Sequence, residues 1–451
     1  MAVPPAAPVT ATGRAVPAVA DHHGQRAELS YINAVDVAAL DEGVRLSVLP
    51  SGVRVATDPM AHTQSAAIAC FVGVGSRDES AALSGASHFL EHLLFKGTLR
   101  RTAREVNRSI DSIGGDFNAY TVRESTVFYV RVPASHVDFA ANLLGEVIVS
   151  PRFDPADIEI ERNVILGELD GAIDSPDDLV FMNLAESIFL DHPLGRETLG
   201  DIETLRSMSV EDIANFHEQW YRPANFVMAA AGKVDHDAMC EVAERHWGAR
   251  PAGERPVRLV PTEKMRAEVT EIRDIEQVHL ALGWRGVTSL NDDRIALSVI
   301  NHALGDGPSS RLHEEIRERR GLAYAVSSMG SSSSDAGTQT VYCATAPEHV
   351  PHVLAVIDET IAAIAGDGID DEELEVAKGY LSGSMLMALE DSSSRMSRLG
   401  SAVLNHGRVI PVRESLDKVA AVTHDEVRRI AASVFGGERV VSIVGPPDSS
   451  A

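Results

Sequence analysis

Two stretches far apart in the chain show the same pattern of residues. Val127–Ile148 reads VFYVRVPASHVDFAANLLGEVI, and Thr340–Ile361 reads TVYCATAPEHVPHVLAVIDETI. Each stretch is a strand-like apolar run, then a proline, then an amphipathic helix. Tyr129 aligns with Tyr342 at an offset of 213, and this offset holds through strand and helix, although the two prolines are one residue out of step. A repeat of this size predicts a duplicated fold.

The repeat divides the chain into two halves. We predict an α+β fold of two homologous domains, each a mostly antiparallel sheet packed with helices. The first domain would be residues 29–247 and the second residues 268–447. A linker at 248–267 would join them, because it begins with the Pro- and Gly-containing stretch GARPAGERP. Residues 1–28, rich in Ala, Pro and Val, are predicted to be a disordered tail, with a weak mitochondrial presequence as the alternative.

The composition excludes several classes of function. The 451 residues include 40 Lys and Arg against 66 Asp and Glu, a net charge of −26, which argues against nucleic acid and anionic membranes as partners. Three cysteines without C-x-x-C spacing argue against a disulfide framework and fit a reducing compartment. No apolar run approaches the ~18 residues of a membrane helix. We therefore expect a cytoplasmic protein, with the mitochondrial matrix as the alternative.

A helix carrying metal-binding residues is predicted in the first half, where Ser87–Phe95 reads SHFLEHLLF between two glycines. His88 and His92 would lie one turn apart on one face, and Glu91 borders that face. Two neutral imidazoles suit Zn²⁺, and a carboxylate beside them suits a base for metal-bound water. The order H-x-x-E-H reverses the commoner H-E-x-x-H and occurs among zinc hydrolases. A pair of core or surface histidines is the structural alternative.

Zinc needs a further protein ligand, and the segment ERNVILGEL offers two carboxylates. Glu161 and Glu168 are seven residues apart, which places them two turns apart on one helix face. One of them can bind the metal while the other supports the site. In isolation such a pair indicates a solvated acidic face, but beside the histidine motif it indicates a ligand.

Taken together, these segments resemble the pitrilysin–insulysin metallopeptidases, a family whose short-chain members include mitochondrial processing peptidase and bacterial homologues. The resemblance covers nearly the whole chain after the tail. The similar segments are SHFLEHLLFKGT (87–98) for the zinc helix, ERNVILGEL (161–169) for the third-ligand helix and GGDFNAYT (114–121) for the substrate-binding strand, with HPLGRETLG (192–200), YRPANFVMAAAGKVD (221–235) and SSRLHEEIRERRGLAYAV (309–326) as further matches.

The resemblance implies a role for each residue of the motif. His88, His92 and Glu168 would bind one Zn²⁺ per chain, with Mn²⁺ or Co²⁺ as alternatives because affinity order alone does not select zinc. Glu91 would be the general base. Glu161 would be the carboxylate that supports the site. The implied activity is a zinc-dependent endopeptidase that hydrolyses short or unfolded peptides.

Four further residues receive roles from the resemblance. Asn118 and Ala119 would bind the substrate backbone, which would be held as an added β-strand. Arg317 and Tyr324 would contact the substrate and stabilise the tetrahedral oxyanion. Considered alone, Arg317 and Tyr324 are a solvated helix arginine and a strand tyrosine.

The second half lacks the residues of a second zinc site. By the repeat, Ser382 falls near the position of Glu168, and the expected helix 296–304 contains His302 with no neighbouring Glu. We therefore predict a metal-free second domain. The chain is about half as long as the four-domain members of the family, so we expect a homodimer that closes like a clamshell around a chamber. Arg317 and Tyr324 would then act on the zinc site of the partner subunit.

Alternatives remain open at the level of the sequence. The chain could be a non-catalytic structural subunit of a processing-peptidase-like complex, although the zinc motif is intact. It could also need a different partner chain for activity. The net charge of −26 would favour basic peptides as substrates if it lines the chamber, or would serve only solubility. The physiological substrate is left open.

Overall fold

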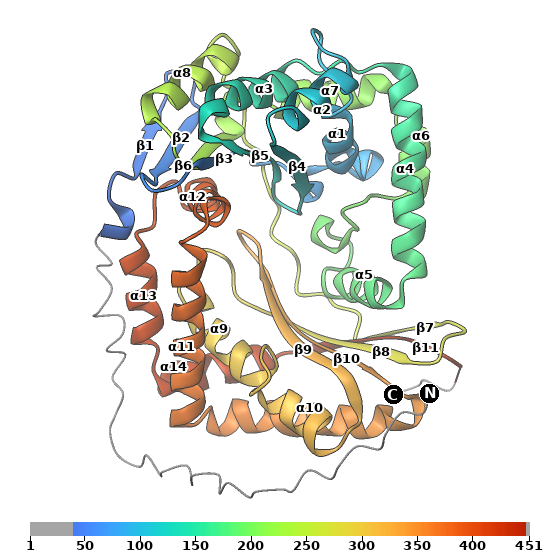
Figure 1. The fold of residues 1–451 in the computed structure, drawn as a ribbon. Coiled ribbons are helices and arrows are strands. Elements are labelled where there is room, and N and C mark those ends of the chain that lie inside the picture. Colours follow the sequence, from blue (N-terminus) through green and yellow to red (C-terminus); the bar gives the residue numbers. More distant parts are fainter. Residues whose placement is uncertain (1–38, 448–451) are drawn as a thin grey trace, which may run out of the picture.

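The computed structural model describes residues 39–447, which form two halves of equivalent topology (Figure 1). The predicted tail, residues 1–28, lies outside the described residues, as do residues 29–38 of the predicted first domain. Among residues 39–447, every helix is too short or too polar to span a bilayer.

The first half contains a six-stranded sheet in the order β1-β2-β6-β3-β5-β4. Its strands are β1 (Arg45–Val48), β2 (Arg54–Pro59), β3 (Ser65–Val72), β4 (Asp116–Thr121), β5 (Thr126–Pro133) and β6 (Phe226–Gly232). Its helices are α1 (Ala86–Leu94), α2 (Ala103–Asp111), α3 (Val137–Val149), α4 (Pro155–Asp174), α5 (Pro176–Ile188), α6 (Ile202–Ser207), α7 (Val210–Trp220) and α8 (His236–Trp247).

The second half contains a five-stranded sheet in the order β7-β11-β8-β10-β9. Its strands are β7 (Glu268–Ile272), β8 (Val278–Arg285), β9 (Ala323–Ser332), β10 (Gly337–Thr345) and β11 (Arg439–Gly445). Its helices are α9 (Arg294–Leu304), the short η8 (His313–Arg319), α10 (Val350–Asp367), α11 (Asp371–Ala388), α12 (Ser392–His406), α13 (Val412–Ala421) and α14 (His424–Phe435).

The predicted repeat and fold class are confirmed. The first quoted stretch forms β5 and α3, and the second forms β10 and α10. In each sheet one strand pair is parallel, β2 with β6 and β7 with β11, and the other pairs are antiparallel. Strand β1 has no counterpart among the described residues of the second sheet.

Each sheet is covered on one face by a helix from the other half. Helix α12 packs on the first sheet and α5 packs on the second (Figure 1). On α12 the side chains of Met396, Leu399 and Val403 are buried against the first sheet. On α5, Leu184 and Ile188 are buried with residues of β8 and β11. Since burying one such side chain stabilises a fold by roughly 1.5–3 kcal/mol, this exchange holds the two halves together.

Small residues let the exchanged helices lie close to the sheets. A Cβ atom on Gly400 of α12 would lie 2.0 Å from the Phe71 ring on β3. A Cβ atom on Gly283 of β8 would lie 2.5 Å from Ile188 on α5. Gly400 therefore needs glycine for space, because a larger residue would overlap the buried Phe71 ring, whereas at Gly283 the tip of the Ile188 side chain would have to move aside.

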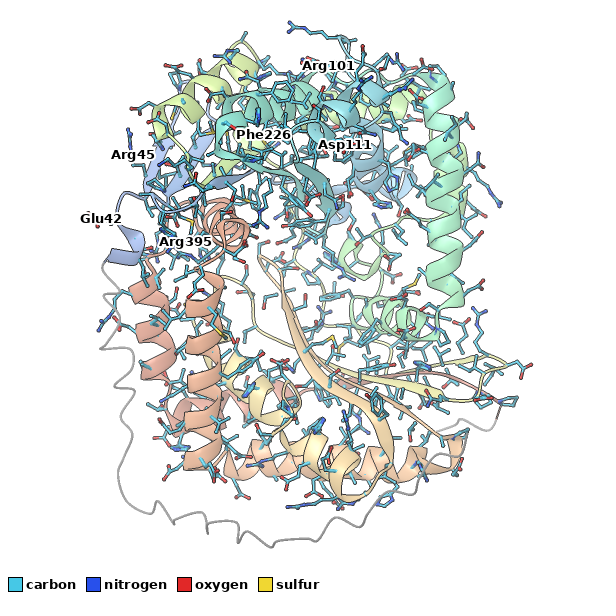
Figure 2. The ribbon with its side chains drawn as sticks, viewed as in Figure 1. Glu42, Arg45, Arg101, Asp111, Phe226 and Arg395 are labelled. Atoms are coloured by element: carbon cyan, nitrogen blue, oxygen red, sulfur yellow. The ribbon has the colours of Figure 1, made fainter. Side chains whose placement is uncertain are left out.

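A buried ion pair fixes the start of α12 on the first half. Arg395 donates from Nη1 to both carboxylate oxygens of Asp58 on β2, each at 3.1 Å, and to the carbonyl oxygen of Leu40. Figure 2 labels Arg395 where α12 approaches the first half. Burial raises the pKa of the Asp58 carboxyl, and the Arg395 guanidinium offsets part of that rise. Removing one partner of such a pair would leave an uncompensated buried charge.

The hairpins of the two sheets meet at the centre of the molecule. Glu124, in the turn between β4 and β5, accepts hydrogen bonds from the backbone and side chain of Ser334, in the turn between β9 and β10. The buried Arg77 donates to Glu124 at 2.5 Å and to Asp335 at 2.7 Å. The turn of one half is therefore bonded directly to the turn of the other.

Replacing Gly400 tests how tightly α12 fits the first sheet. We expect Gly400→Ala to lower the free energy of unfolding by about 1–3 kcal/mol, because the new methyl group overlaps the Phe71 ring. Gly383→Ala in α11 is the matched control, since its Cβ meets nothing within 4 Å and it should gain up to about 1 kcal/mol of helix propensity. Urea unfolding measures both, and equal stability of the two variants would contradict the close fit.

Candidate metal centre

Helix α1 forms where the sequence predicts a helix, and it turns two histidines away from the core. It begins after Gly85, whose φ of +93° favours glycine and whose Cβ would lie 2.8 Å from the carbonyl oxygen of Leu199. Phe89 and Leu90 are fully buried in the first core. His88 and His92 lie on another face of the helix, turned toward α4.

Helix α4 brings two carboxylates to α1. Its first turn is set by Asp154, which accepts a hydrogen bond from the Ala156 amide, and by Pro155 at the first helical position. Glu161 is buried and Glu168 is partly exposed, two turns further along. Helix α4 packs directly on α1, so both carboxylates reach its histidines.

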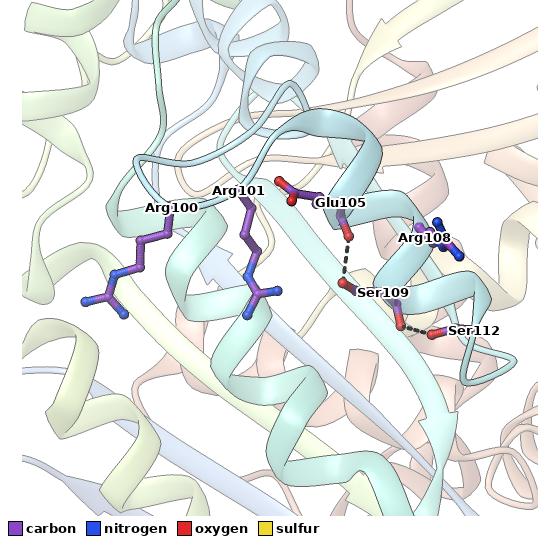
Figure 3. A pocket seen from close by; sticks show the side chains of 6 residues that line it. All are labelled: Arg100, Arg101, Glu105, Arg108, Ser109 and Ser112. Atoms are coloured by element: carbon purple, nitrogen blue, oxygen red, sulfur yellow. Dashed lines mark hydrogen bonds between the residues drawn. The ribbon is translucent and has the colours of Figure 1, made fainter.

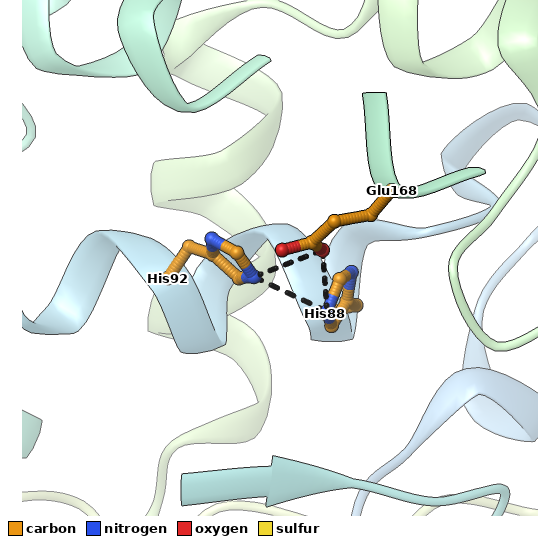
Figure 4. A group of neighbouring side chains, drawn as sticks. All are labelled: His88, His92 and Glu168. Atoms are coloured by element: carbon orange, nitrogen blue, oxygen red, sulfur yellow. Dashed lines mark hydrogen bonds and ion pairs between the residues drawn. The ribbon is translucent and has the colours of Figure 1, made fainter. Parts of the chain in front are cut away.

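The three predicted ligands converge on one point (Figure 4). The Nε2 atoms of His88 and His92 are 3.2 Å apart. Glu168 Oε2 lies 3.7 Å from His88 Nε2 and 3.5 Å from His92 Nε2. A tetrahedral ion with bonds of 2.0–2.1 Å places its ligand atoms about 3.3 Å apart, which fits this triangle.

The chemistry of the three donor atoms also fits a cation. Glu161 Oε2 lies 3.0 Å from His92 Nδ1, and since a carboxylate can only accept, this nitrogen carries the proton. His92 Nε2 therefore presents a lone pair toward Glu168. Burial lowers the pKa of His88 to about 4, so its imidazole is neutral at neutral pH. A positive ion between these groups would satisfy all three.

Lys96 and Glu161 support the site from one side. Lys96 Nζ lies 2.5 Å from Glu161 Oε1, while Glu161 Oε2 orients His92. A carboxylate that accepts from the distal ring nitrogen of a metal-binding histidine fixes its tautomer and raises its basicity. The structure therefore places Glu161 where the sequence predicts it, beside the ligands and in contact with His92.

Glu91 lies beside the ligands and is held by the end of β4. Its Oε2 accepts a hydrogen bond of 2.5 Å from the Thr121 hydroxyl. Burial raises the pKa of the Glu91 carboxyl, the Thr121 bond and His92 lower it, and Glu168 raises it further. A partly buried carboxylate with a raised pKa is a better proton acceptor than an exposed one.

Family models match most of the chain. The model described as "Insulinase (Peptidase family M16)" matches residues 54–202, and that described as "Peptidase M16 inactive domain" matches residues 207–381. The chain belongs to peptidase family M16. The resemblance to the pitrilysin–insulysin family is therefore confirmed, and His88, His92, Glu91, Glu161 and Glu168 all lie within the first matched region.

Several M16 relatives share most of this chain. An "uncharacterized zinc protease" of Mycobacterium leprae is 39% identical over 416 residues, which cover 91% of this chain and 93% of the relative. One of Bacillus subtilis is 34% identical and covers 88% of this chain and 97% of the relative.

Solved structures share the fold. A protease from Helicobacter pylori has a TM-score of 0.83 at 21% identity, covering 89% of this chain and 99% of that chain. A "peptidase M16 inactive domain" from Pseudomonas fluorescens has a TM-score of 0.84 at 20% identity, covering 90% of this chain and 98% of that chain. The clamshell of two sheet-and-helix halves is thus the M16 fold.

Asn118 and Ala119 lie on β4, the edge strand of the M16 first half. Asn118 is exposed, and its side-chain Oδ1 accepts a hydrogen bond of 2.8 Å from the Ala119 amide. The same strand ends at Thr121, which bonds Glu91. An extended peptide added to this edge would therefore run past the metal centre.

Arg317 and Tyr324 lie in the second half, on η8 and at the start of β9. The Arg317 guanidinium stacks over the Tyr324 ring at 4.5 Å, and Tyr324 is 79% exposed. An extended strand rises about 3.3 Å per residue, so Tyr324 is roughly 26 Å from Ser332, where β9 reaches the central turn. Within residues 39–447, no hydrogen bond, ion pair or ring contact joins this pair to His88, His92 or Glu168.

The second half has a different arrangement where the first has its metal centre. His302 of α9 stacks on Tyr380 of α11 with ring centroids 4.2 Å apart. Ser382 on α11 is fully buried. Within residues 39–447, the cluster of His88, His92 and Glu168 is the single group of three His, Cys, Asp or Glu side chains close enough to share a metal ion.

Three supporting residues were not predicted from the sequence. Glu79 accepts hydrogen bonds from the amides of Gly85 and Ser87 and so caps α1, while burial raises the pKa of its carboxyl to about 7. Thr121 and Lys96 are the other two. Lys96 lies in the turn just beyond the end of α1, four residues after His92, and its closeness to the motif in the sequence is the one signal for it.

A basic surface cavity lies away from the metal centre. It has a volume of about 520 Å³ and is lined by residues of α2 and the loop before it (Figure 3): Arg100, Arg101, Glu105, Arg108, Ser109 and Ser112. None of these is a ligand, and Glu105 is bonded to the amide and hydroxyl of Thr102. The cavity is therefore not part of the candidate site.

Glu161→Gln tests the support of the metal ligands. We expect metal affinity to fall about 10–100-fold, because His92 loses its charged partner. Glu159→Gln is the matched control, since Glu159 lies on the same helix but pairs with Arg162 instead. Titration against a competing chelator measures both affinities. An affinity in Glu161→Gln equal to that of the control would contradict this role.

Proposed function

We propose that this chain is a zinc-dependent endopeptidase that hydrolyses short or unfolded peptides. The observation that carries the proposal is the convergence of His88, His92 and Glu168 within 3.7 Å of one another, with Glu91 on the same helix. Three protein ligands with an open position are typical of a catalytic zinc site, whereas structural sites are closed by four. The names of the relatives support zinc as the metal.

Bound zinc would supply polarisation of the scissile carbonyl and a water of lowered pKa. Glu91 would take the proton from that water and pass it to the leaving amine. Its Oε2 is engaged by the Thr121 hydroxyl, which orients the carboxylate. The burial that raises its pKa makes it fit to hold a proton between the two transfers.

The substrate would bind as an extended strand on the free edge of β4. The backbone of this strand can pair with a peptide of any sequence, so we expect loose side-chain specificity. Asn118 and Ala119 would contribute the contacts nearest the scissile bond. The net charge of −26 supports a preference for basic peptides. The three cysteines are free thiols, which supports a reducing compartment such as the cytoplasm.

A non-catalytic subunit is the second candidate function. The family model that matches residues 207–381 is described as an "inactive domain". This range covers most of the second half. The intact ligand set of the first half favours the peptidase. A structural subunit has no need of a base such as Glu91 held in place by Thr121.

We also propose that two copies form a homodimer in which Arg317 and Tyr324 act on the partner subunit's metal centre. The support is that neither side chain contacts a metal ligand among residues 39–447, and that β9 carries Tyr324 roughly 26 Å away from the central turn. The exposure of Tyr324 leaves its phenol available to a second molecule. A phenol and a guanidinium near the developing oxyanion would stabilise its charge.

Glu91→Gln tests the proposed reaction. We expect it to lower the cleavage rate of a quenched peptide by about 10²–10⁴-fold, because the base is lost, while bound metal stays at the wild-type level. Glu105→Gln on α2 is the control and should cleave normally. Treatment of the wild type with a chelator should abolish cleavage, and zinc should restore it. Full activity of Glu91→Gln or of the metal-free wild type would contradict the proposal.

Mixed dimers test whether the second half acts across the dimer. Glu91→Gln and Tyr324→Phe chains are each expected to be nearly inactive alone. When they are mixed and allowed to exchange, each mixed dimer should contain one complete site, so activity should rise toward a quarter of the wild-type level. No recovery, in a mixture shown by mass spectrometry to contain mixed dimers, would show that the pair does not act in trans.

A further inference from the structure

A small cavity lies where the two halves and their linker meet. It has a volume of about 140 Å³ and is lined by residues of β2, the linker, the central turns and the end of α12. Three arginines, Arg54, Arg255 and Arg258, line it together with one carboxylate, Glu124. This excess of positive charge stands out in a chain whose net charge is −26.

The charges at one side of this cavity are fully paired. Arg258 donates to both carboxylate oxygens of Asp78, each at 2.9 Å. Glu124 accepts from Arg77 and from the amide and hydroxyl of Ser334. Neither Arg258 nor Glu124 is therefore short of a partner.

Arg54 and Arg255 have no such partner. Within residues 39–447, no carboxylate lies within 4.0 Å of either guanidinium. Arg54 is only 7% exposed, donates from Nη1 to the Val403 carbonyl oxygen at 2.9 Å, and has a buried Nε without a hydrogen-bond partner. Arg255 is exposed and donates from Nε to the Ala224 carbonyl oxygen at 3.3 Å.

An unpaired buried cation is costly, and an anion would remove that cost. Burial and the repulsion of Arg255 lower the pKa of Arg54 to about 10. A guanidinium presents its donors in a planar fork that pairs two oxygens of one anion at once. The Ser289 hydroxyl and the Asn405 side-chain amide also line the cavity. Within residues 39–447, neither of these two side chains forms a hydrogen bond.

We propose that this cavity binds one small oxyanion of the phosphate class, held by Arg54 and Arg255. Arg54 belongs to β2 of the first sheet, Arg255 to the linker, and Asn405 to α12 of the second half. The bound anion would thus join three segments whose relative positions set how the two halves are held. The site is independent of the proposed peptidase reaction, since it shares no residue with the metal centre.

Calorimetric titration of inorganic phosphate into the full chain tests the site. The buffer contains sodium gluconate so that ionic strength stays constant, and the protein is measured both with metal and after chelator treatment, because phosphate can also bind a metal ion. We expect one phosphate per chain in both preparations, together with a rise in melting temperature. Arg255→Gln and Arg54→Gln should each weaken binding at least tenfold.

Arg206→Gln is the matched control, because Arg206 is exposed on α6 and does not line the cavity. It removes the same charge and should bind phosphate as the wild type does. Arg255→Gln keeps the test decisive even if Arg54→Gln fails to fold, since Arg255 is exposed. Absence of saturable binding, binding that vanishes with the metal, unchanged affinity in Arg255→Gln, or equal affinity for chloride would each overturn the proposal.

Discussion

The exchange of α5 and α12 between the two sheets is the constraint on which the rest of the structure depends. A sheet buried on both faces needs a helix layer on each, and each half supplies only one of these layers for itself. The second layer comes from the other half. Leu399 and Val403 of α12 cover the first sheet, and Leu184 and Ile188 of α5 cover the second. Neither sheet is therefore covered without its neighbour, and the Asp58–Arg395 pair and the central turns add polar links to this apolar contact.

This exchange reaches the metal centre through one helix. Helix α4 carries Glu161 and Glu168 and ends at Asp174, and α5 begins at Pro176. The helix that supplies the third ligand is thus tied, through a single residue, to a helix packed on the second sheet. The other two ligands stay with the first half, where Glu79 caps α1 and the first core buries Phe89. The geometry of the site therefore depends on how the halves are joined, and the cavity beside Arg54 lies at that junction.

Much of this could be predicted from local patterns. The repeat gave two equivalent halves, and the spacings within α1 and α4 placed both histidines and both glutamates on facing helices. The exchange could not be predicted, because an amphipathic pattern shows that α12 has an apolar face but not which sheet covers it. Thr121 and Glu79 were missed for a related reason: each acts through a contact between segments, and neither belongs to a spaced motif. Arg54 was missed because an unpaired buried charge is visible only once its surroundings are known.

The most direct test of the metal centre is X-ray diffraction from crystals of the zinc-loaded chain, recorded on both sides of the zinc absorption edge. We expect one anomalous peak per chain, bonded to His88 Nε2, His92 Nε2 and a carboxylate oxygen of Glu168, with Glu91 nearby but not bonded. We expect no zinc beside His302 in the second half. An anomalous peak at any other group of side chains, with none between His88 and His92, would contradict this assignment of the ligands.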